Sequence, residues 1–307
     1  MTDRLMLLDT ASLYFRAFYG VPDSVVGPDG RPINAARGLL DMIAKLVALY
    51  EPTHLIACWD DDWRPQWRVD LIPSYKAHRV AEEVLTAPDV EVVPDPLEHQ
   101  IPAIREELRA LRIPVVGVSH HEADDVIGTY ATIATIPVDV VTGDRDLFQL
   151  IDDDRDVRVI YTGRGMSNLE VHTGDTTTAK YGIAPSQYAD FAVLRGDPSD
   201  GLPGVAGIGE KTATTLLARY GDLAGIVEAA SGDEGMSAGV RAKLLAAADY
   251  LAVAPQVVAV VRDLALPVGI DEARITRAND SAIASVADKW GLGASLTRAT
   301  DALAARS

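Results

Sequence analysis

Short apolar runs alternate with longer amphipathic segments through the first half of the chain. Because each run is bounded by polar or glycine-containing stretches, we predict buried strands at residues 4–9, 54–59, 115–118, 138–144 and 157–161. Apolar positions at helical spacing predict a helix over 35–50, capped by Asn34, and further helices over 97–112, from 121 onward and over 145–151. Strands that alternate with helices favour a mostly parallel sheet, so the expected fold class is α/β.

The second half of the chain has a different pattern. Beyond about residue 183 the sequence favours helices, with a possible strand at 258–262, and a Gly/Pro-rich hairpin over Gly201–Gly209 precedes a predicted helix at 210–219. We therefore expect a core over 1–180 and a helical region over 181–307. The polar stretch 61–96 is too long for a simple connection, so it is either functional or disordered.

Carboxylates recur where the predicted strands end. Asp9, Asp60 and Asp144 each close an apolar run. In α/β folds the crevice beyond the carboxyl ends of the strands is where ligands bind. So many anions would repel one another unless divalent cations with oxygen ligands, such as Mg²⁺ or Mn²⁺, compensate them. The pattern predicts metal-dependent phosphate chemistry, with these candidate ligands: Asp9, Asp60, Glu122, Asp124, Asp125, Asp144, Asp146, Asp197 and Asp200.

The acids at Glu122, Asp124 and Asp125 have a simpler explanation, since carboxylates in a first helical turn complement the helix dipole. Compensation of the helix dipole does not require three acids in one turn next to strand ends that already carry carboxylates. His120 and His121 suggest zinc only weakly, because the surrounding ligands are hard oxygens and no cysteine partner is available. We interpret both histidines as loop residues.

A net charge of −17 argues at first against nucleic acid as a partner. Divalent ions bound to the carboxylates would make the local electrostatic potential positive. Whether the Lys and Arg residues cluster is therefore more informative than the net charge of the whole chain. The stretch 61–96 carries Arg64, Arg68, Lys76 and Arg79 with Tyr75 among them, which suits phosphate contact and base stacking as well as a solvated loop. The glycine hairpin and the helix start after it suit a DNA phosphate, through Gly204, Gly207, Gly209, Lys211 and Thr212.

Composition adds little beyond this picture. Hydrophobic residues make up 48% and charged residues 24% of the chain, which is ordinary for a soluble protein without a membrane partner. The N-terminus enters a strand directly and does not resemble a signal peptide. Cys58, the single cysteine, lies in an apolar run, so we expect a buried thiol and a cytoplasmic protein.

The ordered set of motifs resembles the flap endonuclease and 5′-nuclease family, which includes the 5′-exonuclease domain of bacterial DNA polymerase I and its standalone relatives. The resemblance spans roughly 4–265 and rests on these motifs in sequence order: Asp9, Cys58-Trp59-Asp60, Tyr75-Lys76-x-x-Arg79, Glu122-Ala-Asp124-Asp125, Gly143-Asp144-x-Asp146, Gly196-Asp197-x-x-Asp200 and Pro203-Gly204-Val205-x-Gly207-Ile208-Gly209-Glu210-Lys211-Thr212-Ala213. Two positions depart from the family pattern. Gly201 replaces an asparagine and Ala206 a proline.

The resemblance implies a PIN-like nuclease core with an arch or clamp over about 61–96, and a helix–three-turn–helix element near 183–220. It also implies two divalent ions. One set of ligands is Asp9, Asp60, Glu122 and Asp124, and the other is Asp125, Asp144, Asp146, Asp197 and Asp200. A potassium ion would bind near Val205 and Ile208 with the hydroxyl of Ser199. Lys76 and Arg79 would stabilise charge at the scissile phosphate, and Tyr75 would stack on a base.

The expected function is therefore structure-selective 5′→3′ exonuclease and flap endonuclease activity on DNA with free 5′ ends, flaps or nicks, in replication or repair. We expect a monomer near the nucleoid, with other replication or repair proteins as partners. Three alternatives remain at this point: a decayed nuclease that only binds DNA junctions, an RNA-directed PIN nuclease, and a phosphatase of small substrates.

Overall fold

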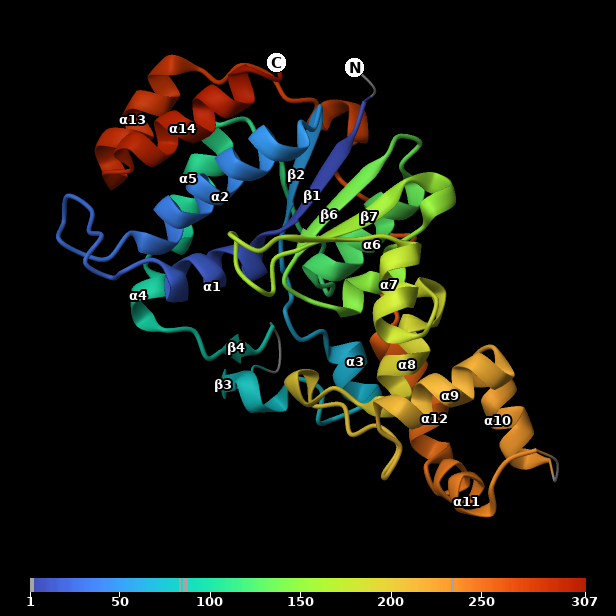
Figure 1. Cartoon of the computed structure of the whole chain (residues 1–307). Helices are drawn as coiled ribbons and strands as arrows, with labels where there is room; N and C mark the ends of the chain where they lie inside the picture. The colour runs from blue at the N-terminus through green and yellow to red at the C-terminus, as the bar shows by residue number, and fades with distance from the viewer. Residues whose placement is uncertain (1–2, 83, 85–87, 233–234) are drawn as a thin grey trace.

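A six-stranded sheet forms the centre of the molecule (Figure 1). The structure is a computed structural model that describes residues 3–82, 84, 88–232 and 235–307. The strand order is β5-β2-β1-β6-β7-β8, and all neighbours are parallel except β7 and β8. The strands are β1 Leu5–Asp9, β2 His54–Cys58, β5 Val115–Val116, β6 Val138–Thr142, β7 Val157–Tyr161 and β8 Glu170–His172. The predicted α/β class is confirmed, and of the six strands in this sheet antiparallel β8 is the one that was not predicted.

The alternation of side chains along β1 divides the core between two faces of the sheet. Leu5 and Leu7 belong to the cluster that also contains the apolar residues of α6. Met6 and Leu8 belong to the opposite cluster, with the apolar residues of α2. Successive strand residues point to opposite faces, and a parallel sheet is covered on both, which is why the strand is apolar throughout.

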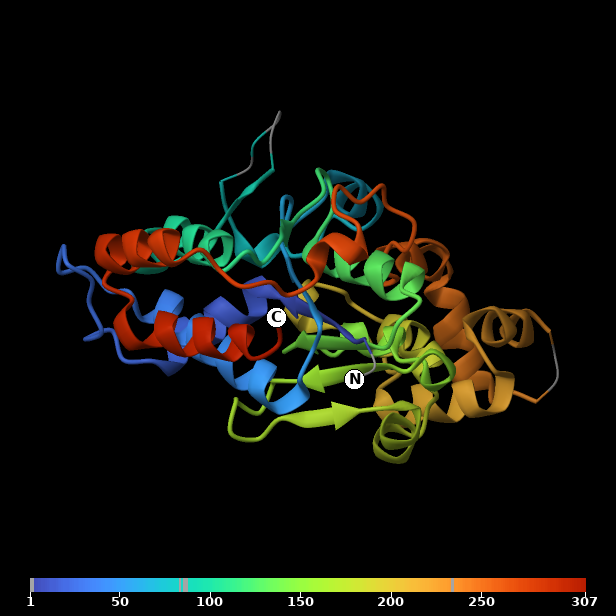
Figure 2. The same cartoon turned by 90° about the horizontal axis from the view of Figure 1, so that it is seen from above.

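Helices from both ends of the chain cover the face of Met6 and Leu8, as Figures 1 and 2 show. They are α1 Thr10–Gly20, α2 Asn34–Tyr50, α5 Ile101–Ala110, α13 Asp280–Trp290 and α14 Gly293–Ala304. The other face is covered by α6 Ala123–Ile133 and by the 3₁₀ turn η2 Asp146–Leu150, which stands where we predicted a regular helix.

The segment predicted as an arch carries short elements that stand away from the sheet (Figure 2). They are α3 Gln66–Leu71, η1 Ala77–Arg79, β3 Val80–Glu82, β4 Val90–Glu91 and α4 Asp95–Glu98, and β3 pairs with β4 in an antiparallel hairpin. Residues 83 and 85–87 of the predicted arch lie outside the described residues.

The helical region lies at one end of the sheet (Figure 1). It contains α7 Gly174–Tyr181, α8 Tyr188–Arg195, α9 Glu210–Tyr220, α10 Leu223–Ser231, α11 Ala238–Ala246 and α12 Ala248–Val258, with short turns η4 Pro185–Gln187 and η5 Pro198–Asp200. Among the residues that the structure describes, no helix is long and apolar enough to cross a bilayer.

Three local predictions are wrong. Residues 258–262 form no strand, because α12 runs to Val258 and the following extended chain packs along α6 instead of joining the sheet. Asn34 lies inside α2 and donates to the carbonyls of Phe18 and Val21, so it holds the end of α1 rather than capping α2. The last two helices pack on α2 and α5, so the helical region does not extend to 307 as one unit.

Glu107 is fully buried on α5, and neither of its carboxylate oxygens has a hydrogen-bond partner among the described residues. Burial raises the pKa of Glu107 well above its usual value. The folded chain therefore binds this proton more tightly than the unfolded chain, and the resulting stability is present at low pH and is lost as pH rises through the folded pKa.

We expect Glu107→Leu to raise the free energy of unfolding by ~1–3 kcal/mol above the folded pKa, and to show no such gain below the unfolded pKa. Urea unfolding of both proteins across a pH series measures the difference. Glu106→Leu is the matched control, because Glu106 bonds to Lys289 and Trp290 and its loss should stabilise at no pH. A pH-independent Glu107→Leu difference would contradict the burial of an ionisable group.

Candidate active site

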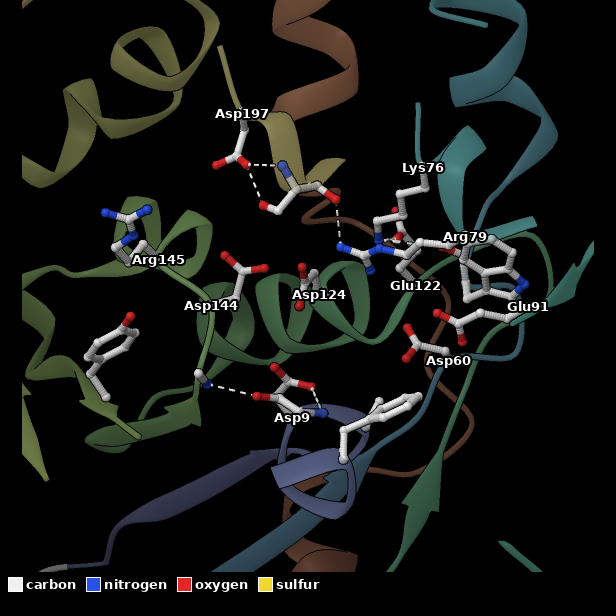
Figure 3. A pocket seen from close by; sticks show the side chains of 17 residues that line it. Asp9, Asp60, Lys76, Arg79, Glu91, Glu122, Asp124, Asp144, Arg145 and Asp197 are labelled. Carbon is white, nitrogen blue, oxygen red and sulfur yellow. Dashed lines mark hydrogen bonds and ion pairs between the residues drawn. The ribbon is translucent and has the colours of Figure 1, made fainter. Parts of the chain in front are cut away.

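An acidic pocket opens at the carboxyl ends of β1, β2 and β6, between the sheet, the arch and the start of the helical region (Figure 3). Six of the nine predicted metal ligands line it: Asp9, Asp60, Glu122, Asp124, Asp144 and Asp197. The remaining three, Asp125, Asp146 and Asp200, are not among its lining residues.

Asp9 and Asp60 are fixed by backbone and hydroxyl donors at the ends of their strands. Asp9 accepts from the backbone N–H of Ser12 at 3.2 Å and from the hydroxyl of Thr142 at 2.7 Å, so it also caps α1. Asp60 accepts from the backbone N–H of Ala123 at 2.8 Å, at the first residue of α6. Each carboxylate therefore connects a strand end to the neighbouring element, and this positions it at the pocket wall.

Glu122 is the meeting point of the arch and the sheet. Its carboxylate contacts the ammonium of Lys76, and it accepts from the hydroxyl of Tyr75 at 2.7 Å and from Arg68 at 2.5 Å. The prediction that Tyr75 stacks on a base is wrong for this conformation, since its ring is buried and its hydroxyl is committed to Glu122. Lys76 and Arg79 do line the pocket, as predicted for cations near a phosphate.

Asp125 does not face the pocket. It is fully buried in a bidentate pair with Arg68, at 2.7 and 2.9 Å, and also accepts from the backbone N–H of Val261 at 2.9 Å. Both oxygens already have donors, so the assignment of Asp125 as a metal ligand is not supported by its position. Arg68 is also buried. Its predicted contact with DNA is wrong, because the guanidinium is bonded to Glu122 and Asp125 and is not accessible from the surface.

Arg64 is also buried, although we predicted that it contacts DNA. It pairs with Asp89 at 2.5 Å and donates to the carbonyls of Tyr75 and Pro73. These bonds fix the base of the arch from within. The spacing of the basic residues could not distinguish such interior arginines from exposed ones, because both lie in one polar stretch.

The remaining acids come from β6 and the helical region. The carboxylate of Asp144 accepts from the backbone N–H of Asp146 at 2.9 Å, and Asp197 accepts from the N–H of Ser199 at 2.9 Å. Asp200 pairs with Arg79 at 3.1 Å. Asp146 is nearly buried behind the pocket. Sequence reasoning missed Glu91 on β4 and Arg145, which also line the pocket; Arg145 lies inside the motif of Asp144, whereas no signal marked Glu91.

The carboxylates around this pocket are poorly compensated. Burial raises the pKa of Asp9 to about 7, the Thr142 hydroxyl opposes that rise, and the neighbouring Asp60 adds to it. Burial and adjacent acids also raise the pKa values of Asp124 and Asp146 well above the usual range. Buried anions that repel one another are stabilised by protons or by bound cations.

Within the described ranges, no three His, Cys, Asp or Glu side chains form a closed group that could hold a metal ion as they stand. The chemistry of the donor set nevertheless fits a hard divalent cation, because Asp and Glu side chains supply the candidate ligands and no histidine that the structure describes lines the pocket. The carboxylates that line the pocket, not those paired behind it, are the residues suited to hold such ions.

The glycine hairpin presents an exposed backbone next to α9. Gly207 has φ +76°, and Gly209 has no neighbouring atom within 4 Å of an added Cβ, which leaves the start of α9 open. Lys211 is exposed and Thr212 is half-buried on its first turn. Gly204, at φ +65°, instead packs closely against Gly196, so its role is structural. Lys243, which we did not predict, donates to the carbonyl of Gly207 at 2.8 Å.

The predicted potassium ligands are placed in two settings. Ser199 lines the acidic pocket, where its hydroxyl contacts Asp197. The carbonyl of Val205 accepts from the N–H of Ile208 at 2.9 Å within the hairpin. The potassium site stays a prediction.

The arch is joined to the hairpin by backbone contacts at Gly201. Lys76 donates its N–H to the carbonyl of Asp200 at 2.9 Å, and the hydroxyl of Ser74 donates to the carbonyl of Gly201 at 2.7 Å. Gly201 has φ +69°, and a Cβ there would lie 2.0 Å from the carbonyl oxygen of Ser74. The replacement of the family's asparagine by Gly201 thus permits a close approach that a side chain would prevent.

We expect Gly201→Ala to separate the arch from the hairpin, giving faster proteolysis within 64–82 and roughly 10–100-fold slower DNA cleavage, because Lys76 and Arg79 would be displaced. Gly165→Ala is the matched control: Gly165 has φ +90° but open space around it, so it reports only the backbone cost. Equal effects of the two substitutions would show that the Ser74 contact is unimportant.

Two family descriptions together match residues 4–281. The first, "5′-3′ exonuclease, N-terminal resolvase-like domain", matches 4–182, and the second, "5′-3′ exonuclease, C-terminal SAM fold", matches 183–281. This chain belongs to the 5′-3′ exonuclease family. A 5′-3′ exonuclease of Streptomyces coelicolor is 56% identical over 301 residues, which cover 98% of this chain and 100% of the relative.

A second member of the family, a 5′-3′ exonuclease of Mycobacterium tuberculosis, is 48% identical over 99% of this chain and 98% of its own length. Among solved structures, a bacteriophage T5 flap endonuclease in complex with DNA and metal ions has a TM-score of 0.63 at 17% identity, over 98% of this chain and 97% of the other. At that identity the likeness concerns the fold. The resemblance drawn from the motifs is confirmed by the family match.

Proposed function

We propose that this 5′-3′ exonuclease family member hydrolyses DNA phosphodiesters at 5′ ends, 5′ flaps and nicks, with Mg²⁺ or Mn²⁺ as cofactor. The observation that supports this most is the acidic pocket, where six carboxylates from five segments meet two cations of the arch. The T5 flap endonuclease of the same fold was solved with DNA and metal ions, which agrees with the proposal.

Different residues of the pocket would have different roles. Asp9, Asp60 and Asp124 would hold divalent cations from the sheet side, and Asp144 and Asp197 from the side of the helical region. When bound, such ions supply an activated water and charge stabilisation at the departing 3′-oxygen. Glu122 would hold Lys76 at the pocket wall.

Lys76 and Arg79 would bind the scissile phosphate, where preorganised positive charge lowers the barrier most. Lys76 is nearly buried between Glu122 and the carbonyl of Trp63, at 3.4 Å, and Arg79 is held by Asp200 and the carbonyl of Ser199. Fixed cations of this kind require little rearrangement when the phosphate binds.

The hairpin would hold the duplex part of the substrate through Gly207, Gly209 and Lys211, which contact backbone rather than bases. Recognition by shape would make the enzyme structure-selective. A potassium ion near Val205 and Ile208, a monomeric state and other replication or repair proteins as partners remain parts of this proposal.

Lys76→Ala tests the role of the arch. We expect single-turnover cleavage to fall by about 10²–10³-fold, with the affinity for DNA reduced far less, because one charged donor is lost at the reacting phosphate. Quench-flow cleavage and fluorescence anisotropy separate the two effects. Lys289→Ala is the control, since that lysine pairs with Glu106 far from the pocket. An unchanged single-turnover rate would remove Lys76 from the chemistry.

The activity itself is tested by single-turnover cleavage of a 5′-labelled flap duplex with Mg²⁺, Mn²⁺ or EDTA, beside blunt duplex, nicked duplex and an RNA flap. Metal-dependent release of 5′ products from flap or nicked DNA is the expected result. Cleavage of the RNA flap alone would indicate an RNA-directed nuclease. Tight binding to the junction without cleavage in any metal would indicate a protein that only binds DNA.

A further inference from the structure

Three arginines form one flank of α5 and of the turn after it. Arg105 and Arg109 are four residues apart and lie on the same side of α5, and Arg112 follows in the turn after the helix. They line a groove together with Ile113, Pro114 and Val115, which lead into β5. We call these three side chains the arginine flank. At 1.5 Å per helical residue, the flank is about 10 Å long.

The charge of the arginine flank is only partly compensated. Arg105 approaches Asp61 only at 4.0 Å, and its guanidinium stacks on Trp59 at 4.0 Å. The side chains of Arg109 and Arg112 make no hydrogen bond or ion pair with any residue that the structure describes, although the charge of Arg109 is close enough to Glu106 to attract it. Burial lowers the pKa of Arg105, Asp61 opposes that fall, and the nearby Arg109 adds to it, so the two arginines experience one another's field. This is unusual on a chain with a net charge of −17.

Two structural roles account for part of this arrangement. Cations at the end of a helix complement its dipole, and charged side chains protect an edge strand such as β5 from pairing. Arg112, however, adopts φ +61°, a conformation that glycine takes with less strain. Neither role requires a third arginine at a strained position, so the three charges together indicate an anionic partner.

The position of the arginine flank relates it to the acidic pocket. Arg105 stacks on Trp59, and the next residue, Asp60, is a wall of the pocket. From there the flank follows the outermost strand on the side of the sheet opposite β8. The helical region with the hairpin lies at another end of the sheet, on the side of α6, as Figure 1 shows. A DNA strand that leaves the pocket past Trp59 would therefore reach the arginine flank without contacting the hairpin.

We propose that the arginine flank binds the phosphodiester backbone of the single-stranded 5′ arm of the DNA substrate. The inference rests on the proposed nuclease function and adds a second contact surface outside the pocket. A single row of guanidinium groups with no exposed aromatic ring between them contacts backbone phosphates rather than bases. Sequence-independent binding of the arm follows, and longer arms gain more from it.

The decisive variant is Arg109→Ala combined with Arg112→Gly, which removes two unpaired charges and relaxes the backbone at residue 112. Fluorescence anisotropy in EDTA compares two flap duplexes, one with a long 5′ arm and one with a single-nucleotide arm. For the long arm we expect affinity to fall about 3–10-fold, and the slope of log K against log[salt] to fall by about 1.4, at ~0.7 for each single-strand phosphate. Binding and cleavage of the short-arm duplex should not change.

Two further proteins serve as controls. Arg109→Lys with Arg112→Lys keeps the charge and should retain most long-arm binding. Arg277→Ala removes an exposed arginine from another surface and should affect neither substrate. Polyglutamate is added as a competitor, because an acidic protein segment is the other class of partner that such a flank could take.

The outcomes separate this proposal from the proposed function. If the wild-type enzyme cleaves no flap, the nuclease function fails. If it cleaves but the double variant binds the long arm like wild type, the arginine flank is not a DNA site. Equal losses on both arms would mean a contact with the duplex, and preferential binding of polyglutamate would mean an acidic protein partner; each overturns the proposal.

Discussion

Asp124→Asn is expected to lower metal-dependent cleavage by at least about 10³-fold while leaving the fold intact, because it removes a pocket carboxylate that we assign to cation binding. No hydrogen bond holds its carboxylate among the residues that the structure describes, and it points into the pocket in Figure 3. Single-turnover cleavage of a flap duplex in Mg²⁺ measures the loss.

The same substitution should make the metal-free protein more stable. Burial, followed by the charges of Asp9 and Asp144, raises the pKa of Asp124, so the ionised side chain is unfavourable without a cation. Urea unfolding in EDTA should show a higher free energy of unfolding for Asp124→Asn than for wild type. The combination of lost activity and gained stability is characteristic of a residue whose charge serves function.

Asp154→Asn is the matched control, since Asp154 is an exposed acid on a turn far from the pocket and should change neither quantity. Retained turnover in Asp124→Asn would exclude this residue from the cation site. A loss of activity accompanied by lower stability would indicate instead that Asp124 supports the fold.

Arg68→Ala is expected to be the most damaging change to stability, at about 3–5 kcal/mol, because it leaves the carboxylates of Asp125 and Glu122 buried without their cation. Arg68 also donates to the carbonyl of Val257, which ties α3 of the arch to the end of α12. Equilibrium unfolding in urea measures the loss, and the surface change Arg277→Ala should cost less than about 0.5 kcal/mol.

A double substitution tests whether the damage comes from the unpaired charge. Arg68→Met with Asp125→Leu removes both partners of the bidentate pair, so it should be less destabilising than Arg68→Ala alone. If the double variant lost as much stability as the sum of the two single variants, the two side chains would be acting independently. That result would contradict the buried pair.

The position of Asp125 determines how a loss of activity in an Asp125 variant should be interpreted. The sequence places it beside Asp124, and both acids were predicted as metal ligands. The fold separates them, because successive helical residues point about 100° apart: Asp124 faces the pocket and Asp125 faces Arg68. Asp125→Asn should therefore reduce activity through stability, and its defect should diminish at lower temperature, whereas that of Asp124→Asn should not.

The arch shows a similar division. Arg64, Arg68, Tyr75 and Lys76 form one basic and aromatic stretch in the sequence, and each had the same apparent suitability for DNA. In the structure the first three are interior groups that fix the arch to Asp89, Asp125 and Glu122. Of the four cations predicted to contact DNA or the scissile phosphate in this stretch, Lys76 and Arg79 are the two that line the pocket.

By itself, the sequence determined the α/β class, the parallel sheet, the family and the carboxylates that close β1, β2 and β6. These features follow from periodicity and from strand ends that share one edge, which are local properties of the chain. The tertiary structure alone decided which acids and cations face the pocket, since that depends on partners far apart in sequence, such as Arg68 with Asp125, Lys76 with Glu122 and Gly201 with Ser74. Spacing along one segment carries no information about such pairs, because burial and charge compensation are set only when distant segments pack together.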